Sequence, residues 1–162
     1  MNGQRDGEGI LTDKEGREII KGIWENDEIY KGEVNSEGQP HGKGVEVRNE
    51  ERYEGDWVNG LREGKGTLTS FNGGKYVGDF ANNLREGQGE ITYNNGYAYD
   101  GQWKEDKHEG KGTMTYPNGE KYEGDWVNNN RHGEGTQTDQ EGNINYEGKW
   151  KDNNSENIEK QE

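Results

Sequence analysis

The sequence has 162 residues, of which 23% are hydrophobic and 33% are charged, and its formal net charge is −14. Typical soluble domains are roughly 45–50% apolar with glycine included, so this chain is too polar to fill a thick two-layer core. It has no cysteine, which excludes disulfides and thiolate metal sites, and no apolar stretch near the ~20 residues of a membrane span. With 34 acidic against 20 basic residues, nucleic acid and anionic membranes are not expected as main partners.

A motif with the pattern Tyr-x-Gly-x-aromatic recurs along the chain, as in "YEGDW" at 53, with degenerate copies "IKGIW" at 20 and "YKGEV" at 30. From Tyr30 to Tyr122, the first residues of successive motifs lie 23 residues apart, and the last motif begins 24 residues later, at Tyr146. A Gly-x-Gly pair recurs in step, from Gly7/Gly9 to Gly133/Gly135. A fixed period of this length is typical of a repeat architecture. The motif tyrosines are Tyr30, Tyr53, Tyr76, Tyr99, Tyr122 and Tyr146.

Each repeat predicts a β-hairpin. The first strand follows the Gly pair, as in "GTLTSF" from 66, an Asn-Gly turn follows, as at Asn72-Gly73, and the motif forms the second strand. Because side chains alternate between faces, the aromatic residues and the central glycine share one face and the acidic residues share the other. We expect like rings to stack in neighbouring repeats, with the central glycine leaving room for a ring of the next repeat. We also expect the Gly pairs to lie in turns, after loops of constant length. The predicted fold class is all-β: an elongated, single-layer antiparallel sheet of about six stacked hairpins.

The ends of the array are less regular than its middle. Residues 19–34 predict two strands joined by a turn at Glu25 to Glu28. We therefore expect a repeat array over residues 1–150 that is irregular at 19–34. Residues 151–162 are polar and unpatterned, and predict a flexible tail.

Two quoted stretches resemble the MORN repeat (membrane occupation and recognition nexus): "YEGDWVNGLREGKGTLTSFNGGK" and "YEGDWVNNNRHGEGTQTDQEGN". The resemblance covers residues from about 7 to 150. It departs from the pattern at 20–34, at Glu50-Glu51 in place of Asn-Gly, and at Val34 in place of an aromatic residue. It implies a twisted, groove-shaped sheet and a non-catalytic scaffold or adaptor. By family analogy the assembly would be cytoskeletal or ciliary, such as an axoneme.

The expected site is a groove lined by the aromatic face, which would hold a helix or extended peptide. The alternative is that these rings are simply the core. For the face as a whole we expect both roles at once, because a one-layer sheet cannot bury its aromatic residues on another layer. Three tyrosines outside the motif, Tyr93, Tyr97 and Tyr116, are less needed for stacking and are better binding candidates. The expected groove residues are Tyr53, Trp57, Tyr76, Phe80, Tyr93, Tyr97, Tyr99, Trp103, Tyr116, Tyr122, Trp126, Tyr146 and Trp150.

The opposite face predicts a row of carboxylates that could bind a basic protein surface or calcium, or could simply be solvated beside lysines. A flat row does not converge as calcium ligands must. The row comprises Glu54, Asp56, Asp79, Asp100, Glu123, Asp125 and Glu147.

No arrangement of residues predicts catalysis. His41, His108 and His132 are expected to be loop residues, and the Gly pairs lack the third glycine of a dinucleotide site. We therefore expect no enzyme activity, no cofactor and no metal. The polar N-terminus lacks the apolar core of a signal peptide, which favours the cytoplasm. Alternatives to the adaptor are a phospholipid-contact module and an accessory subunit of an enzyme complex, and self-association stays open.

Overall fold

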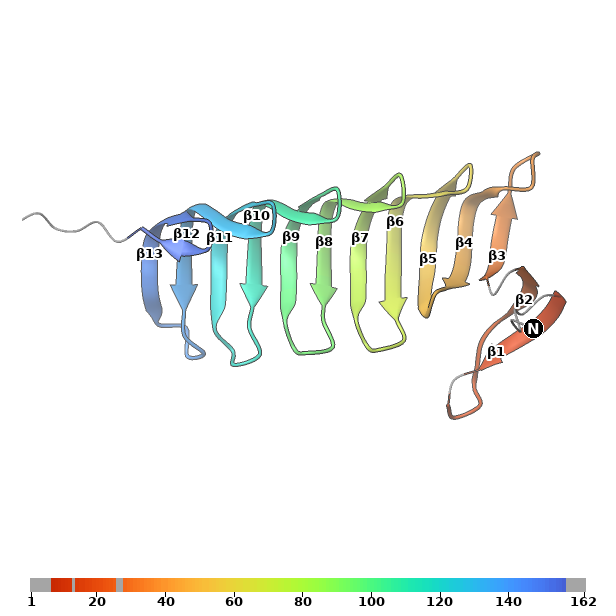
Figure 1. The fold of residues 1–162 in the computed structure, drawn as a ribbon, viewed down its shortest axis with the longest axis horizontal. Helices are drawn as coiled ribbons and strands as arrows, with labels where there is room; N and C mark the ends of the chain where they lie inside the picture. The colour runs from red at the N-terminus through yellow and green to blue at the C-terminus, as the bar shows by residue number, and fades with distance from the viewer. Residues whose placement is uncertain (1–6, 13, 26–27, 157–162) are drawn as a thin grey trace, which may run out of the picture. The chain divides into compact units, whose positions relative to one another are not determined.

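The computed structural model describes residues 7–12, 14–25 and 28–156, and the chain divides into two compact units, Met1–Asn83 and Leu84–Glu162. Every regular element in these residues is a β strand, and within each unit the strands pair antiparallel in chain order (Figure 1). No helix or second sheet among the described residues covers either unit, so each unit is a single open layer. The predicted all-β class of stacked antiparallel hairpins is confirmed.

The first unit contains the irregular region, and the prediction for it is confirmed. Trp24 pairs with Ile29 and Glu25 with Glu28, so two antiparallel strands meet there as expected, with turn residues 26–27 outside the described residues. The strands are β1 (Gly7–Thr12), β2 (Glu18–Glu25), β3 (Glu28–Val34), β4 (Pro40–Arg48), β5 (Glu51–Val58), β6 (Leu61–Ser70) and β7 (Lys75–Ala81).

The second unit ends later than we predicted. Lys151 pairs with Asn154, and the Glu156 amide donates to the Lys149 carbonyl at 2.7 Å, so residues 151–156 close a last hairpin instead of starting a tail. The rest of the predicted tail, residues 157–162, lies outside the described residues. The strands are β8 (Leu84–Thr92), β9 (Ala98–Lys104), β10 (Lys107–Thr115), β11 (Lys121–Val127), β12 (Asn130–Thr138), β13 (Ile144–Lys151) and β14 (Asn154–Ser155).

The Gly-x-Gly pairs lie inside strands, so our assignment of these pairs to turns was wrong. In β10, the second glycine of the pair, Gly112, lies opposite Gly101 of β9 on one side and opposite Gly124 of β11 on the other. The first glycine, Gly110, has a φ of 66°. It falls where the register of β10 against β9 shifts between His108 and Gly112. A left-handed glycine at such a bulge bends the strand and increases its twist.

The segments that we expected to be constant loops are two-residue turns followed at once by the next strand. In Asn128-Asn129 both residues have positive φ, at 49° and 68°, and Glu105-Asp106 has 47° and 66°. This pattern is typical of the type I′ hairpin turn, which matches the twist of the flanking strands. The second hairpin also turns this way, at Asn49-Glu50, one residue before the position expected from the sequence.

The Asn-Gly turns have a different geometry from the one we predicted. At Asn95-Gly96 only the glycine has positive φ, at 87°, and the Gly96 amide donates to the Tyr93 carbonyl at 3.0 Å. The Asn95 Oδ1 accepts from the Tyr97 amide at 3.3 Å, as in an Asx-turn. The connection is therefore a three-residue loop. The asparagine side chain accepts a hydrogen bond in this loop, and the glycine supplies the residue with positive φ.

Candidate protein-binding surfaces

Most rings of the predicted groove form the core of the two units. The motif rings of the inner repeats are all buried, and Tyr53, Tyr99 and Tyr122 are 0% exposed. A side chain with no exposed surface cannot contact a partner, so the aromatic ladder acts first as the core of a one-layer fold. The buried rings are Tyr53, Trp57, Tyr76, Phe80, Tyr99, Trp103, Tyr122, Trp126 and Trp150.

The rings alternate along the ladder, which differs from the stacking of like on like that we expected. Tyr122 meets Trp126 of its own motif at 5.2 Å between centroids and Trp150 of the next motif at 5.0 Å, both edge to face. Tyr53 contacts Trp57 and Phe80 in the same way, at 5.1 and 5.0 Å. Each edge-to-face pair contributes about 0.5–1.5 kcal/mol beyond area burial. Within each unit, a series of such pairs thus replaces the missing second layer.

The polar atoms of the buried rings are satisfied within the repeat. The Tyr99 hydroxyl donates to the Gln102 carbonyl at 3.0 Å, and the Trp103 Nε1 donates to the Gly89 carbonyl at 2.9 Å. Burial raises the pKa of Tyr99 far above its ordinary value, and its nearby carboxylates add to this. These tyrosines therefore remain neutral hydrogen-bond donors.

The glycines of the motif make room for a ring, but the ring comes from the same motif. A Cβ on Gly101 would lie 2.5 Å from the Gly112 Cα and 2.7 Å from the Tyr99 hydroxyl oxygen. A Cβ on Gly112 would lie 2.5 Å from Tyr99 Cζ. The tyrosine thus lies over the facing glycines of two paired strands, and no larger residue fits at either position.

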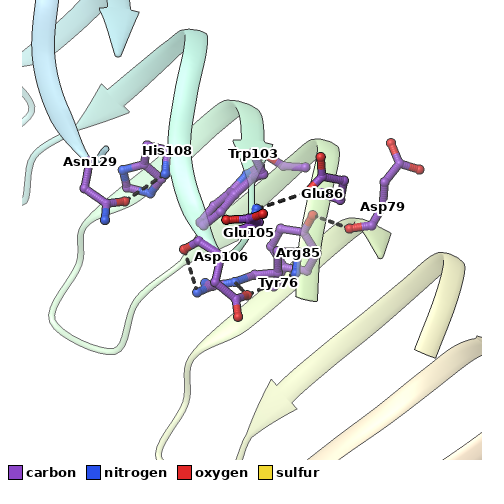
Figure 2. Close-up of polar contacts among 10 residues, drawn as sticks. Tyr76, Asp79, Arg85, Glu86, Trp103, Glu105, Asp106, His108 and Asn129 are labelled. Atoms are coloured by element: carbon purple, nitrogen blue, oxygen red, sulfur yellow. Dashed lines mark hydrogen bonds and ion pairs between the residues drawn. The ribbon is translucent and has the colours of Figure 1, made fainter. Parts of the chain in front are cut away.

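A second ladder lies over the rings, and our sequence analysis missed it. Arg62, Arg85, His108 and Arg131 are spaced by 23 residues, which is the signal that could have revealed them. The Arg85 guanidinium carbon lies 4.4 Å from the centroid of Trp103, and that of Arg131 lies 4.2 Å from Trp150. Figure 2 shows Arg85 beside Trp103 and bound to Asp106, whose Oδ1 accepts from Arg85 Nε at 2.7 Å. The Arg85 and Arg131 guanidinium groups thus lie over the rings and bind the following two-residue turn, at Asp106 and Asn153.

His108 occupies the cation position of one repeat, so our assignment of it as a loop residue was wrong. Its ring stacks on Tyr99 at 3.7 Å and 18°, and also contacts Trp103 and Trp126. Its backbone amide donates to the Asn129 Oδ1 at 2.7 Å (Figure 2), while its Nε2 is buried with no hydrogen-bond partner in the described residues. Burial, with a smaller contribution from the Arg85 cation, lowers the pKa of His108 to about 4.

Four predicted groove tyrosines retain accessible surface. Tyr97 is exposed, Tyr93 and Tyr116 are half-buried, and Tyr146 on β13 is partly buried. Tyr97 and Tyr116 meet edge to face at 5.8 Å. Tyr93 and Tyr116 occupy the position held by Ser70 in the first unit, so the repeat does not need an aromatic residue there.

The acidic residues of the opposite face are partly neutralised by a regular set of lysines. Lys43 pairs with Asp56 at 2.5 Å, and Lys111 pairs with Asp125 at 2.7 Å. The Lys43 ammonium holds the pKa of Asp56 below its usual value. The Asp56 Oδ2 also accepts from the Lys65 amide at 3.0 Å, across the bulge. These aspartates therefore have a structural role in addition to being solvated.

The opposite face of the second unit carries an open hollow of about 640 Å³ across β8 to β13. Four carboxylates line it, against a single lysine that is already paired with Asp125. The hollow is polar and acidic, and residues of all six strands from β8 to β13 line it. Its charged lining residues are Asp100, Lys111, Glu123, Glu134 and Glu147.

No group of three or more His, Asp or Glu in the described residues is placed to hold a metal ion. None of the structure's described segments is a helix that could cross a membrane.

Comparison with known proteins identifies the repeats. The family model described as MORN repeat matches six segments that together span most of the chain: residues 1–16, 30–49, 53–75, 76–96, 99–121 and 122–144. A comparison with curated proteins found no significant match. MORN repeats are in general a non-catalytic module that binds proteins or membranes. The matched repeats coincide with the hairpins and their ring ladder, and the chain belongs to the MORN repeat family.

Proposed function

We propose that this chain is a non-catalytic adaptor that binds a protein segment on the ring face of its second unit. The observation that carries the proposal is the cluster of Tyr93, Tyr97 and Tyr116, which we call the tyrosine cluster. These rings are accessible, two of them touch, and they lie where other repeats place small or polar residues. Tyrosine is enriched at binding hot spots because a large, rigid ring loses little conformational entropy when it binds.

Charges of both signs lie beside the tyrosine cluster. Burial raises the pKa of Tyr93 and of Tyr116, while the Arg85 cation beside Tyr93 and the Arg131 cation beside Tyr116 oppose this rise. The Glu120 carboxylate adds to the rise at Tyr116. A helix or extended peptide with an apolar side chain on the rings and a basic residue toward Glu120 would suit both the rings and this carboxylate.

The acidic hollow on the opposite face supports a second contact with a basic protein surface. Its carboxylates outnumber its single lysine, so complementary charge would speed association and make it dependent on ionic strength. By family analogy, the assembly would be cytoplasmic and cytoskeletal or ciliary.

The test compares partner capture by the wild type with capture by a double variant, Tyr93→Ser and Tyr116→Ser, which copies Ser70. Phe71→Asn is the matched control, because it removes an exposed ring outside the cluster and copies Asn94. We expect a protein that is captured by the wild type and by the control to be lost with the double variant, while all three melt at similar temperatures. Equal capture by all three chains would refute the assignment.

Two other functions are separated by simple measurements. A phospholipid-contact module would sediment with vesicles that contain anionic lipid, whereas we expect this acidic chain to remain in the supernatant. An accessory subunit of an enzyme would copurify with a catalytic activity.

A further inference from the structure

The two kinds of strand alternate along each unit, and the first and last long strands are complementary. Each motif strand, such as β5, β9 or β11, pairs with a following Gly-x-Gly strand, with a register shift beside the central glycine. β13 is a motif strand with no such strand after it in the described residues, and β1 is a Gly-x-Gly strand with no motif strand before it. We propose that β13 of one copy of this chain binds β1 of a second copy, so that the chains join head to tail.

The free edge of β13 lacks the contacts that complete the inner repeats. β14 pairs with β13 only at Trp150 and Lys151, which leaves Ile144–Gly148 unpaired on that side in the described residues. A Cβ on Gly124 would lie 2.6 Å from the Gly135 Cα of the next strand, but the three atoms nearest to a Cβ on Gly148 all belong to Tyr146. Within residues 7–12, 14–25 and 28–156, no glycine of a following strand therefore faces Gly148.

Tyr146 is also left with half of its ring contacts. Tyr122 lies between Trp126 and Trp150, whereas Tyr146 meets Trp150 at 5.2 Å and no second ring in the described part of the chain. It is accordingly accessible, while Tyr122 is 0% exposed. An aromatic residue from a following repeat would complete this site.

β1 carries the complementary gap. Its register on β2 places Gly7 opposite Trp24 and Gly9 opposite Gly22, as Gly110 and Gly112 lie opposite Trp126 and Gly124 on the β10–β11 pair. A Cβ on Gly135 would lie 2.6 Å from Tyr122 Cζ, but a Cβ on Gly9 would meet only Trp24 in the described residues. No tyrosine among the described residues fills, at Gly9, the space that a preceding tyrosine fills in the inner repeats.

The two terminal segments of the chain do not carry the missing groups. Residues 1–6, Met-Asn-Gly-Gln-Arg-Asp, include no aromatic residue, and residues 157–162, Asn-Ile-Glu-Lys-Gln-Glu, include no glycine. A second copy supplies both groups at once.

The inner repeats predict the register of the joint, by which we mean the proposed pairing of β13 of one copy with β1 of the next. Gly55 lies opposite Gly66, Glu54 opposite Thr67 and Tyr53 opposite Leu68, so Gly148 would lie opposite Gly9, Glu147 opposite Ile10 and Tyr146 opposite Leu11. Trp24 would then cover Tyr146 as Phe80 covers Tyr53. Backbone pairing at an open sheet edge is a general mode of strand addition. Because the joined surfaces differ, the contact repeats from copy to copy, into a ring or a filament.

The first experiment uses the absence of cysteine in this chain. Ile10→Cys and Glu147→Cys each introduce one thiol at exposed positions that would face each other across the joint. Directly opposed residues on paired strands are close enough for a disulfide. We expect the mixed single variants to form a covalent heterodimer, and the double variant to form a ladder on a non-reducing gel.

The matched control is Glu123→Cys, because Glu123 is the equivalent motif residue on β11, whose edge is already paired with β12. Heterodimer at the same level with Glu123→Cys as with Glu147→Cys would overturn the proposal. So would a product that contains only two Glu147→Cys chains, since this would join like edges.

Sedimentation velocity supplies a measurement that does not depend on cross-linking. We expect the average mass of the wild type to rise with concentration, and Tyr146→Ala to lose this rise. Phe71→Ala, which removes an exposed ring far from either edge in sequence, should keep it. A wild type that stays monomeric at every concentration would overturn the proposal without bearing on the partner bound by the tyrosine cluster.

Discussion

Protonation of His108 should make this fold sensitive to mild acid. The ordinary pKa of 6.5 applies to the unfolded chain, while burial against Tyr99, Trp103 and Trp126 lowers the folded value to about 4. The unfolded state therefore binds more protons between these values, so stability is present above pH 6.5 and is lost as the pH falls toward 4. From the two pKa values the loss is about 2 kcal/mol between pH 7 and pH 5, and about 3 kcal/mol in total.

The assay is urea unfolding at pH 7, 6 and 5, followed by tryptophan fluorescence. The matched variant is His108→Arg, because Arg85 and Arg131 hold the equivalent position in neighbouring repeats, and His108→Gln is a second, uncharged control. Carboxylates contribute equally to all three chains, so the difference between wild type and either variant isolates the histidine. We expect that difference to change by about 2 kcal/mol from pH 7 to pH 5. A difference that stays constant with pH would show that His108 is not held neutral by the fold.

Three further predictions concern the ladder and the end of the chain. Gly101→Val should abolish cooperative unfolding of the second unit in a thermal melt, because its Cβ would lie 2.5 Å from the Gly112 Cα. Asp100→Val, on the exposed face, should not have this effect. Similar thermal melts for the two variants would refute the close packing of the glycines. Trp103→Ala should cost about 3–5 kcal/mol in urea unfolding because the ring is core, and a value below about 1 kcal/mol would contradict this. Deleting residues 151–162 should lower the melting temperature, because this deletion removes the Asn153 carbonyl that accepts from Arg131 Nη2 at 2.7 Å. Deleting residues 157–162 alone should leave the melting temperature unchanged. Equal melting temperatures for the two deletions would argue against a structured last hairpin.

The repeat itself was predictable because aromatic residues and glycines recur at a fixed spacing along the chain. Tyrosines spaced by 23 residues, with glycine two positions later, left few alternatives to stacked hairpins. The turns were harder, because both connections are rich in asparagine. Asn95-Gly96 was the stronger sequence signal for a type I′ turn, yet that turn lies at Asn128-Asn129 and its equivalents. Which of the two connections forms the two-residue turn depends on the register in which the strands pair, and the residues of the turn do not determine that register by themselves.

The candidate site could be predicted only in part. Composition suggested that the rings are both core and groove, and the structure separates the two roles by burial, leaving the tyrosine cluster and Tyr146 accessible. The cation ladder was missed because Arg62 and Arg85 precede the Gly pairs in segments that resembled loops. Residues 151–156 resembled a tail because the strand they begin is short.

The sequence by itself determined the fold class, the repeat, the family and the acidic character of the surface, because each depends on residue type and spacing along one chain. The tertiary structure decided which ring touches which, where His108 is buried and where the sheet edges remain open. These properties depend on the register between strands, and a shift of one residue in register would move every ring to the opposite face. The glycines facing each other under Tyr99 fix that register, because no other residue leaves room for the ring.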